Sequence, residues 1–283
     1  MKVMVTGAGG MLARALVPEL RSRGHEVVAL DRAALDVTDE RAVAERVLGE
    51  RPGAVVQCAA YTAVDAAEEE EDLAFRVNAE AAGFVARACD QIGALFVYPS
   101  TDYVFRGNGT HPYRPGDPPD PVNAYGRSKL GGETASRGAS RALVVRTSWL
   151  YGEGGKNFVD TISRLARERD RLEVVEDQVG RPTSTASLAW IICELIDSGS
   201  EGTFHATDGG EPVSWLGFAR EIVSRLALEI PVFPVSSATL HRAAARPGYS
   251  VLDLSGTEAV IGRALPHWKE ALARYLGSRG GGA

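Results

Sequence analysis

The feature that most constrains this chain is a short apolar stretch that runs directly into a glycine-rich loop. Residues Lys2–Thr6 are apolar and β-branched enough to form a strand buried on both faces, and they lead into the loop Gly7–Ala13. A helix over Met11–Arg23 is expected next, closed by Gly24. A tight turn without side chains lets backbone N–H groups and the N-terminus of the following helix approach a pyrophosphate, while the small Ala13 lets that helix pack closely on the sheet. The stretch therefore predicts a dinucleotide-binding unit.

The second predicted strand, Glu26–Leu30, ends at a pair of opposite charges. Asp31 follows it at roughly the twenty-residue offset at which such a unit places an acid on the adenosine ribose. Arg32 comes next, and a guanidinium at this position can hold the 2′-phosphate that distinguishes NADP from NAD. The sequence leaves the choice between the two cofactors open.

Strands and helices continue to alternate through the first half of the chain. Further strands are expected over Ala54–Gln57, Leu95–Pro99 and Ala142–Arg146, and helices over Asp39–Gly49, Asp72–Ile92 and Ala124–Ser136. This rhythm predicts an α/β fold with a Rossmann-type, doubly wound parallel sheet. Ligands of such sheets lie outside the carboxyl ends of the strands, so the residues that follow each strand are candidates for the site.

In the second half the alternation loosens. Helices are expected over Asn157–Glu168, Thr185–Ile196, Trp215–Ala227 and His267–Tyr275, and strands over Leu172–Glu176 and Thr203–Ala206. We therefore expect an NAD(P)-binding domain over residues 1–150 and mainly a smaller C-terminal substrate-binding lobe over residues 151–283. The glycine-rich tail Ser278–Ala283 is expected to be disordered.

Tyr125 and Lys129 lie four residues apart, which puts them on one face of a predicted helix. A phenol has a reference pKa of about 10, and a neighbouring positive charge lowers that value by stabilising the phenolate. Tyr125 then becomes a usable general acid. Such a pair alone is common on helix surfaces, but Thr101, which follows the fourth strand, would supply a hydroxyl to a carbonyl bound near Tyr125.

Composition excludes several other classes of function. A net charge of −6 gives no general attraction to nucleic acid or to an anionic membrane. The widely spaced Cys58, Cys89 and Cys193 argue against a disulfide framework and against a thiolate metal site. No apolar stretch is long enough for a membrane span or for the core of a signal peptide. We therefore expect a cytoplasmic protein.

Several motifs together resemble one family. The glycine loop, Ser100–Phe105, the Tyr125 and Lys129 pair and Arg146–Gly152 are similar to an extended short-chain dehydrogenase/reductase, specifically to the dTDP-4-dehydrorhamnose reductase family. The match continues through Ala59–Asp65, Lys156–Phe158, Asp177–Thr183 and Ala245–Ser250, so it spans nearly the whole chain. In that family late segments return to the main sheet, which makes a boundary at residue 150 coarse.

The resemblance implies the last, reductive step in making a nucleotide-linked deoxysugar. NADPH, with NADH as the alternative, would deliver hydride to the C4 carbonyl of a dTDP-linked 4-keto sugar such as dTDP-4-dehydro-L-rhamnose, giving dTDP-L-rhamnose. Tyr125 would deliver the proton, and Thr101 would hydrogen-bond the same oxygen. Lys129 would bind the nicotinamide ribose and lower the pKa of Tyr125. The chemistry agrees with these roles, because the cofactor carries the hydride and the protein needs only positioning and a matched acid.

The glycine loop and the resemblance together give the expected contacts. Those to the cofactor are Gly7, Gly10, Met11, Leu12, Asp31, Arg32, Asp36, Val37, Ala59, Ala60, Thr62, Tyr125 and Lys129. Those to the substrate are Val64, Thr101, Asp102, Tyr103, Trp149, Asn157, Arg181 and Arg246. An aromatic face suits the C–H groups of a sugar, which favours Trp149. Arg181 and Arg246 are candidates for the diphosphate or for bracing the site, with a surface salt bridge as the alternative for either.

Some members of the resembled family bind Mg²⁺ between subunits through carboxylates, including glutamates on the first helix and on the helix after the G-x-P-T segment. The matching positions here are Ala15 and Ala186. A methyl group cannot ligate a hard cation. We therefore expect no metal site, and either a monomer or a metal-independent homodimer.

Three other functions remain open. The 4-keto sugar could be one made for an antibiotic glycoside, of the dihydrostreptose type. A nucleotide-sugar 4-epimerase would retain its nicotinamide, and a regulatory subunit would bind the dinucleotide without turnover. A 4,6-dehydratase is disfavoured, because it would carry Thr-Asp-Glu where this chain has Thr101-Asp102-Tyr103.

Overall fold

The parallel sheet predicted from the sequence is confirmed. In the computed structural model, which describes residues 1–280, its strands are β1 (Lys2–Thr6), β2 (Glu26–Leu30), β3 (Ala54–Gln57), β4 (Leu95–Thr101), β5 (Ala142–Thr147) and β10 (Gly202–His205). They lie in the order β10-β5-β4-β3-β1-β2, and each neighbouring pair is parallel. The chain reverses its direction of travel across the sheet between β1 and β3, which is where ligands of this fold bind.

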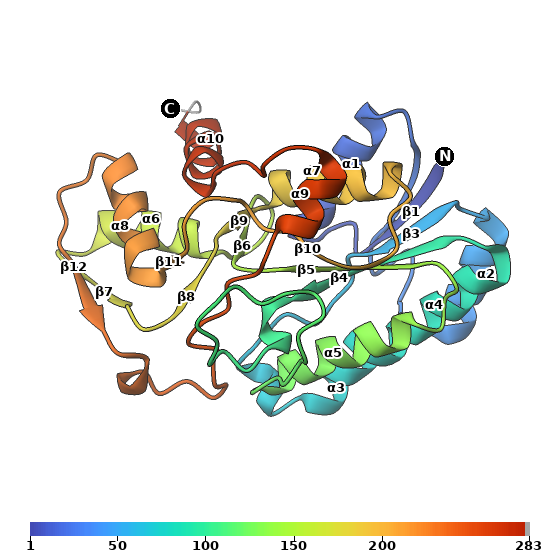
Figure 1. Ribbon diagram of the computed structural model, residues 1–283, viewed down its shortest axis with the longest axis horizontal. Coiled ribbons are helices and arrows are strands. Elements are labelled where there is room, and N and C mark those ends of the chain that lie inside the picture. The colour runs from blue at the N-terminus through green and yellow to red at the C-terminus, as the bar shows by residue number, and fades with distance from the viewer. Residues whose placement is uncertain (281–283) are drawn as a thin grey trace.

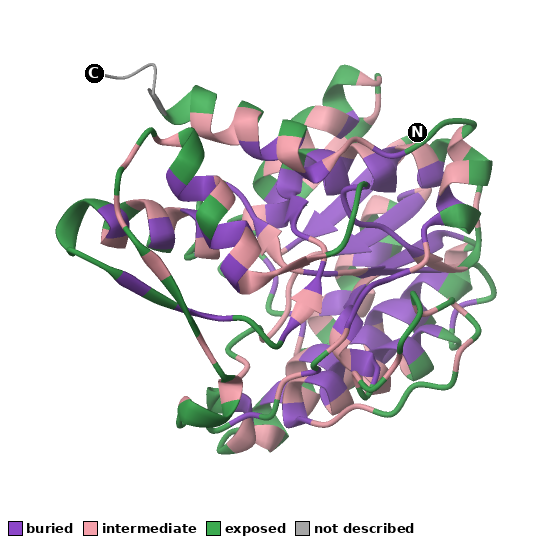
Figure 2. Ribbon diagram, turned by 60° about the vertical axis from the view of Figure 1, so that its left-hand side comes forward, coloured by how far each residue is buried: buried purple, intermediate pink, exposed green. Residues whose placement is uncertain are grey.

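Helices cover both faces of the sheet (Figure 1). On one face lie α1 (Met11–Ser22), α7 (Thr185–Asp197) and α9 (Ser255–Ile261), and on the other α2 (Glu40–Glu50), α4 (Ala81–Ile92) and α5 (Ala124–Ser136). Val3 and Val5 belong to the core under α1 and α7, whereas Met4 belongs to the core under α2 and α4. Because the inner strands are buried on both faces (Figure 2), they are apolar without alternation.

The helix expected over Asp72–Ile92 is interrupted by a wider turn. It runs as α3 (Glu71–Phe75), a π-helical segment over Arg76–Glu80, and then α4. The π segment carries the fully buried Asn78, whose Oδ1 accepts from the Tyr61 N–H at 2.9 Å and whose Nδ2 donates to the Tyr61 carbonyl at 3.0 Å. The wider turn therefore fixes the loop that follows β3.

The second half of the chain builds a smaller core beside the sheet. It contains α6 (Phe158–Glu168), α8 (Trp215–Arg225) and α10 (Trp268–Gly280), and the strand pairs β6 (Leu150–Tyr151) with β9 (Thr183–Ser184), β7 (Leu172–Val175) with β12 (Val232–Val235), and β8 (Val179–Gly180) with β11 (Val213–Ser214). Short 3₁₀ turns lie over Ala66–Glu68, Asp102–Val104 and Ser237–Thr239. Although α7 and β10 come after residue 150 in the sequence, they pack with the main sheet. The chain therefore crosses between the two parts more than once, and residue 150 marks only a coarse boundary.

The C-terminal helix is longer than the sequence indicated. α10 continues to Gly280, so the expectation of disorder is wrong for Ser278 to Gly280, and its remainder, residues 281–283, lies outside the described residues. Within residues 1–280 no helix combines the length and the apolar character needed to cross a membrane.

A glycine lets α5, the helix that carries Tyr125, approach the sheet closely. A Cβ on Gly132 would lie 2.1 Å from the Tyr98 hydroxyl oxygen and 2.3 Å from the Asn78 carbonyl oxygen. These two groups are themselves joined, because the Tyr98 hydroxyl donates to that carbonyl at 2.8 Å. Neither neighbour can therefore move aside without loss of a buried hydrogen bond.

Replacing Gly132 with Ala should lower the free energy of unfolding by about 1–3 kcal/mol, the usual cost of overpacking a core. Gly49→Ala is the control, because Gly49 lies in α2 with open space where the methyl group would go, and Ala there should add up to about 1 kcal/mol. Urea unfolding of both variants measures the difference. Equal stabilities would show that α5 is not seated by this contact.

Candidate active site

A cleft of about 730 Å³ opens at the carboxyl ends of β1, β2 and β3. The expected cofactor residues that line it are Gly7, Gly10, Asp31, Arg32, Asp36, Val37, Ala59 and Ala60. Sequence reasoning missed its other lining residues, which are Gly9, Ala33, Leu35, Thr38, Cys58, Tyr61, Leu73, Arg76 and Val77. A volume of this size suits a small-molecule site.

Five expected cofactor residues do not line this cleft, among them Tyr125 and Lys129 on α5. Met11 lines a second cavity, Leu12 is buried in the core, and Thr62 is exposed. Met11 and Leu12 are nevertheless the first residues of α1, so any contact that they make to a pyrophosphate would come from their backbone N–H groups.

The glycine loop has the geometry needed to hold a phosphate. Gly7 has a φ of +65°, and a Cβ there would lie 2.5 Å from the backbone nitrogen of Ala59, so no side chain fits between the two loops. At the start of α1, Gly10 offers no side chain to cap the first N–H groups. By contrast α5, α6, α7 and α8 are each capped, by Asn123, Asn157, Ser184 and Ser214. The open N-terminus of α1 is therefore available to an anion.

Of the charged side chains that follow β2, the two carboxylates are fixed by hydrogen bonds and the arginine is not. Asp31 accepts from the Ala34 N–H at 2.9 Å, and Asp36 accepts from the Thr38 hydroxyl at 2.7 Å and from its N–H, which lowers the Asp36 pKa. Arg32, by contrast, has a side chain that is 91% exposed, and within residues 1–280 its one ion-pair partner is Asp36, at 3.9 Å. Its guanidinium is free to turn toward a 2′-phosphate.

Tyr125 and Lys129 lie on α5, and side chains from outside this helix accept hydrogen bonds from the N–H groups of its first turn. Asn123 accepts from the Gly126 N–H at 2.7 Å, and Glu68 accepts from the Ala124 N–H at 2.8 Å. Lys129 is buried, and its Nζ donates to the Pro99 carbonyl at 2.7 Å. Burial lowers the Lys129 pKa to about 7.

The expectation that Lys129 lowers the Tyr125 pKa is wrong for this structure. Burial raises the Tyr125 pKa to about 12, and although hydrogen bonding by Thr101 favours the phenolate, it does not offset the loss of water. The Asp102 carboxyl adds to the rise. The ammonium of Lys129 instead donates a hydrogen bond to the Pro99 carbonyl.

Under these residues lies a buried ion pair that sequence reasoning did not assign. The guanidinium of Arg146 on β5 donates to both oxygens of Glu133 on α5, at 2.9 and 2.7 Å. Ser100, on β4, donates to the same carboxylate at 2.6 Å. The only available signal was the spacing of Glu133, four residues beyond Lys129 on the same helical face.

The expected substrate residues near Tyr125 include both aromatic and acidic side chains. Asp102 is 2% exposed, and the ring of Tyr103 meets the Tyr125 ring edge-on at 6.0 Å between centroids. Val64, also expected there, is half-buried. Trp149 has a φ of +49° and stacks on Trp215, with 3.5 Å between ring centroids. This stack gives a flat apolar surface rather than a mobile ring.

The two expected arginines serve different purposes. Arg246 forms a bidentate ion pair with Asp65, at 2.9 and 2.5 Å. Arg181 donates to the carbonyls of Leu252 and Gly210, at 2.7 and 3.0 Å, so it braces two loops. Arg242, which sequence reasoning missed, carries a charge that acts on Tyr103, as that of Arg246 does. The pair beside Tyr103 is therefore Arg242 and Arg246.

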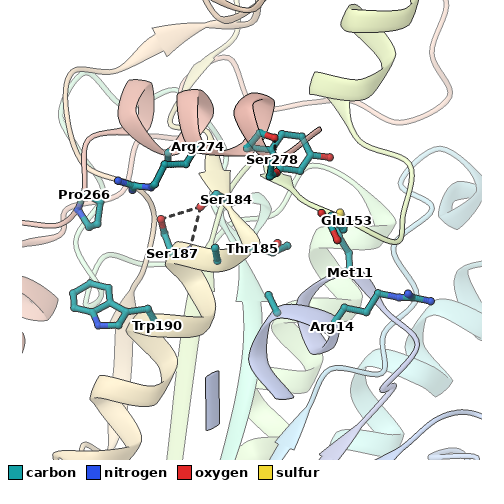
Figure 3. A pocket seen from close by; sticks show the side chains of 14 residues that line it. Met11, Arg14, Glu153, Ser184, Thr185, Ser187, Trp190, Pro266, Arg274 and Ser278 are labelled. Carbon is teal, nitrogen blue, oxygen red and sulfur yellow. Dashed lines mark hydrogen bonds between the residues drawn. The ribbon is translucent and has the colours of Figure 1, made fainter. Parts of the chain in front are cut away.

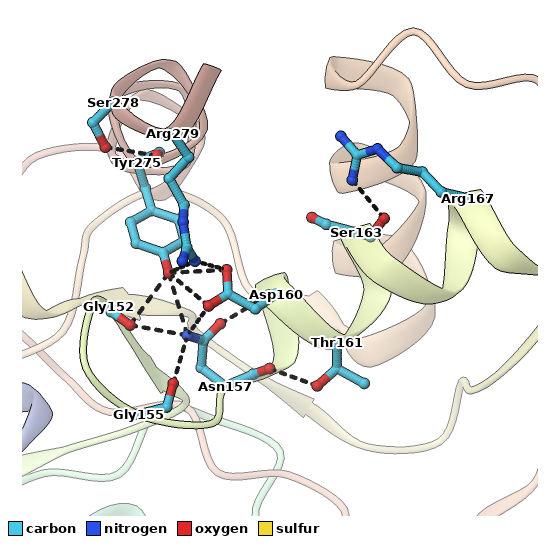
Figure 4. Close-up of polar contacts among 10 residues, drawn as sticks. All are labelled: Gly152, Gly155, Asn157, Asp160, Thr161, Ser163, Arg167, Tyr275, Ser278 and Arg279. Atoms are coloured by element: carbon cyan, nitrogen blue, oxygen red, sulfur yellow. Dashed lines mark hydrogen bonds and ion pairs between the residues drawn. The ribbon is translucent and has the colours of Figure 1, made fainter. Parts of the chain in front are cut away.

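Asn157 caps a helix in this structure (Figure 4). Its Oδ1 accepts from the Asp160 N–H at 2.9 Å, and its Nδ2 donates to the Gly152 carbonyl at 2.9 Å and to the Tyr275 hydroxyl at 3.3 Å. The amide therefore joins the start of α6 to α10, and the expectation of a direct substrate contact finds no support in these bonds.

The comparisons with known proteins agree with this geometry. The family described as "RmlD substrate binding domain" matches residues 1–279. A dTDP-4-dehydrorhamnose reductase of Streptomyces griseus is 45% identical over 277 residues, which are 95% of this chain and 91% of the relative. The chain belongs to the dTDP-4-dehydrorhamnose reductase family.

Solved structures of this family superpose closely on the chain. A dTDP-4-dehydrorhamnose reductase of Clostridium acetobutylicum gives a TM-score of 0.96 at 40% identity, covering 99% of this chain and 100% of the other. The enzyme of Bacillus anthracis, solved in complex with NADP, gives 0.94 at 40% identity, covering 98% and 99%. The resemblance drawn from the motifs is therefore confirmed for the family and for the fold.

A second cavity, of about 500 Å³, lies among α1, α7 and α10 (Figure 3), and Tyr125 is not among its lining residues. Ala15 and Ala186 both line it, at the positions where the resemblance places glutamates in some family members. Among its lining residues the one carboxylate is Glu153. Residues 1–280 contain no cluster of three or more His, Cys, Asp or Glu placed to hold a metal.

Removing the Arg32 guanidinium should weaken the preference for NADPH. We expect the wild-type protein to use both cofactors, with NADPH modestly favoured, and Arg32→Ala to reduce the NADPH to NADH ratio of kcat/KM by about tenfold, or roughly 1.4 kcal/mol. Arg41→Ala is the control, because Arg41 is equally exposed on α2 but does not line the cleft. An unchanged ratio in Arg32→Ala would show that this residue does not read the 2′-phosphate.

Magnesium should affect neither activity nor assembly. Two methyl groups stand where the metal-binding members of the family have carboxylates, so most of the affinity for the cation should be lost. We expect full activity in EDTA and an oligomeric state, measured by light scattering, that is the same with and without Mg²⁺. Magnesium-dependent dimerisation would mean that other carboxylates have replaced the missing pair.

Proposed function

We propose that the protein reduces the C4 carbonyl of a dTDP-linked 4-keto-6-deoxysugar, specifically dTDP-4-dehydro-L-rhamnose to dTDP-L-rhamnose, with NADPH as the reductant and NADH as a weaker substitute. The observation that carries this proposal is the half-buried Tyr125 phenol on α5, close to the Thr101 hydroxyl and one helical turn from the buried Lys129. Membership of the dTDP-4-dehydrorhamnose reductase family supports the choice of sugar.

The residues of the cleft fit a dinucleotide. The N-terminus of α1 and the glycine loop would hold the pyrophosphate, and Asp31 with Arg32 would hold the adenosine ribose and its phosphate. Bound there, NADPH supplies the hydride. The cofactor end of the reaction thus rests on backbone N–H groups and two side chains.

Tyr125 is the proposed proton donor. With a pKa of about 12 it remains protonated throughout the neutral range, and an alkoxide on a sugar carbon is a stronger base than a phenolate, so the transfer is downhill. Thr101 would donate a hydrogen bond to the oxygen that receives the proton. Lys129 is partly charged near neutral pH, because burial lowers its pKa to about 7, and it would bind the nicotinamide ribose.

The substrate would lie on the C-terminal lobe side of Tyr125. The stacked Trp149 offers a face to the sugar C–H groups. Arg246, held by Asp65, and the neighbouring Arg242 are placed near Tyr103 to meet the diphosphate. Tyr103, whose ring meets that of Tyr125 edge-on, completes the proposed sugar contacts.

Two further proposals concern the setting of the reaction. We place the protein in the cytoplasm, with free thiols at Cys58, Cys89 and Cys193. We also propose that it acts as a monomer or as a homodimer that needs no metal, without nucleic acid or membrane as a partner.

The direct test is NADPH oxidation against a panel of dTDP-4-keto sugars, with product stereochemistry read by NMR. We expect the highest kcat/KM for dTDP-4-dehydro-L-rhamnose. A higher value for a 4-keto sugar of an antibiotic glycoside would assign that pathway instead. Retention of nicotinamide through purification, with no net oxidation of NADPH, would identify an epimerase.

Replacing Tyr125 with Phe should reduce turnover by about a hundred- to ten-thousandfold, the usual effect of losing a positioned proton donor. Affinity for NADPH should change little. Tyr275→Phe is the control, because it removes a phenol hydroxyl from α10, outside the cleft. Essentially normal turnover in Tyr125→Phe would rule out this residue as the acid.

A further inference from the structure

Each turnover of the proposed reaction leaves Tyr125 without its proton. The phenolate that remains is disfavoured by the burial that raises the Tyr125 pKa to about 12, so a proton must return before the next cycle. In the proposed complex a dinucleotide and a nucleotide sugar would cover this residue. A group of the protein that stores a proton beside Tyr125 would solve this problem.

The structure contains a chain of hydroxyl and carboxyl groups that ends at Tyr125. The Thr101 hydroxyl donates to the Asp102 Oδ1 at 3.0 Å. The Thr101 hydroxyl also lies close enough to the Tyr125 phenol to favour its phenolate. Both Thr101 and Asp102 are buried, at 6% and 2% exposure. Thr101, at the end of β4, is thus hydrogen-bonded to Asp102 on the following turn and lies close to Tyr125 on α5.

Within residues 1–280 Asp102 forms no ion pair, in contrast to two other carboxylates of the site. Glu133 is paired with Arg146, and Asp65 with Arg246. The groups that act on Asp102 are Ser250, Thr101 and the backbone of its own turn. Its Oδ2 has no hydrogen bond of good geometry within residues 1–280, although the Ser250 hydroxyl lies close enough to favour the carboxylate.

The titratable groups around Asp102 are also unable to hold it ionised. Tyr103 on the same turn and Tyr125 on α5 are neutral phenols, and Ser250 comes from the segment that packs against the turn. The charges of Arg242 and Arg246 reach Tyr103 but are not among the groups that act on Asp102. Burial therefore dominates and raises the Asp102 pKa to about 7, so the carboxyl is neutral in much of the protein near pH 7.

We propose that Asp102 is a proton reservoir that recharges Tyr125 through the Thr101 hydroxyl. This inference rests on the proposed function, since it needs Tyr125 to lose a proton in each cycle. The step is balanced: the Thr101 proton moves to the phenolate oxygen of Tyr125, and the Asp102 carboxyl proton moves to the Thr101 oxygen. Asp102 is left as a carboxylate and takes a proton from water after the product has left.

This role differs from that of a simple substrate contact. A carboxylate that only accepts from a sugar hydroxyl would change KM, or would slow the first turnover and later turnovers alike. A proton reservoir would leave the first turnover intact, because Tyr125 begins that cycle protonated. Only the cycles that follow would be slow.

The test compares the first turnover with the steady state in Asp102→Asn, which keeps the shape of the side chain but holds no acidic proton. We expect rapid-mixing experiments on wild type and variant to show first-turnover NADPH oxidation at rates within about twofold of each other. Steady-state kcat of the variant should be lower by about tenfold or more. Equal slowing of both phases, a change in KM alone, or an unchanged steady state would each overturn the proposal.

A second variant keeps the test valid if Asp102→Asn folds poorly. Ser250→Ala removes a hydroxyl that favours the carboxylate, so it should raise the Asp102 pKa further and move the alkaline decline of steady-state kcat to higher pH. If the alkaline decline of kcat stayed at the same pH, another group would be responsible for it, and the proposal would be contradicted. Failure of the proposed function itself would look different, because wild-type protein would then oxidise no NADPH with any dTDP-4-keto sugar.

Discussion

The buried ion pair between Glu133 and Arg146 holds together the elements that carry the proposed reaction. It joins α5 to β5, and Ser100 ties the same carboxylate to β4. Taking two charges out of water costs several kcal/mol per ion, so such a pair persists only with bidentate geometry and further hydrogen bonds. Both conditions are met here. The position of Tyr125 and Lys129 relative to Thr101 depends on this junction.

The same dry packing determines the acid–base character of the site. Glycine at position 132 lets α5 press against β4, and burial then favours the neutral forms of Tyr125, Lys129 and Asp102 together. A neutral phenol still carries its proton when the substrate binds, and the neutral Asp102 carboxyl can replace the proton that Tyr125 gives up. One physical cause, exclusion of water, thus keeps both the proton donor Tyr125 and the proposed proton reservoir Asp102 protonated.

Much of the fold followed from local sequence. The apolar strands, the glycine loop and the Tyr125 and Lys129 spacing are all short-range patterns, and so they predicted the parallel sheet and the helices around it correctly. The partner of Glu133 could not be predicted, because which cation meets it depends on how β5 packs against α5. The intramolecular partners of Asn157 and Arg181 could not be predicted for a similar reason, since a motif does not reveal that its polar groups bond loops and helix ends; their contacts to substrate stay predictions. The Tyr125 pKa was predicted in the wrong direction because burial, which decides it, exists only in the folded chain.

The central claim is that hydride passes from NADPH to C4 of the sugar while Tyr125 protonates the oxygen. Its most direct test uses NADPH that carries deuterium at the transferred position of the nicotinamide, with dTDP-4-dehydro-L-rhamnose as the acceptor. NMR and mass spectrometry of the product should show one deuterium, at C4, for each NADP formed. A product without deuterium, or with the label at another carbon, would contradict the account.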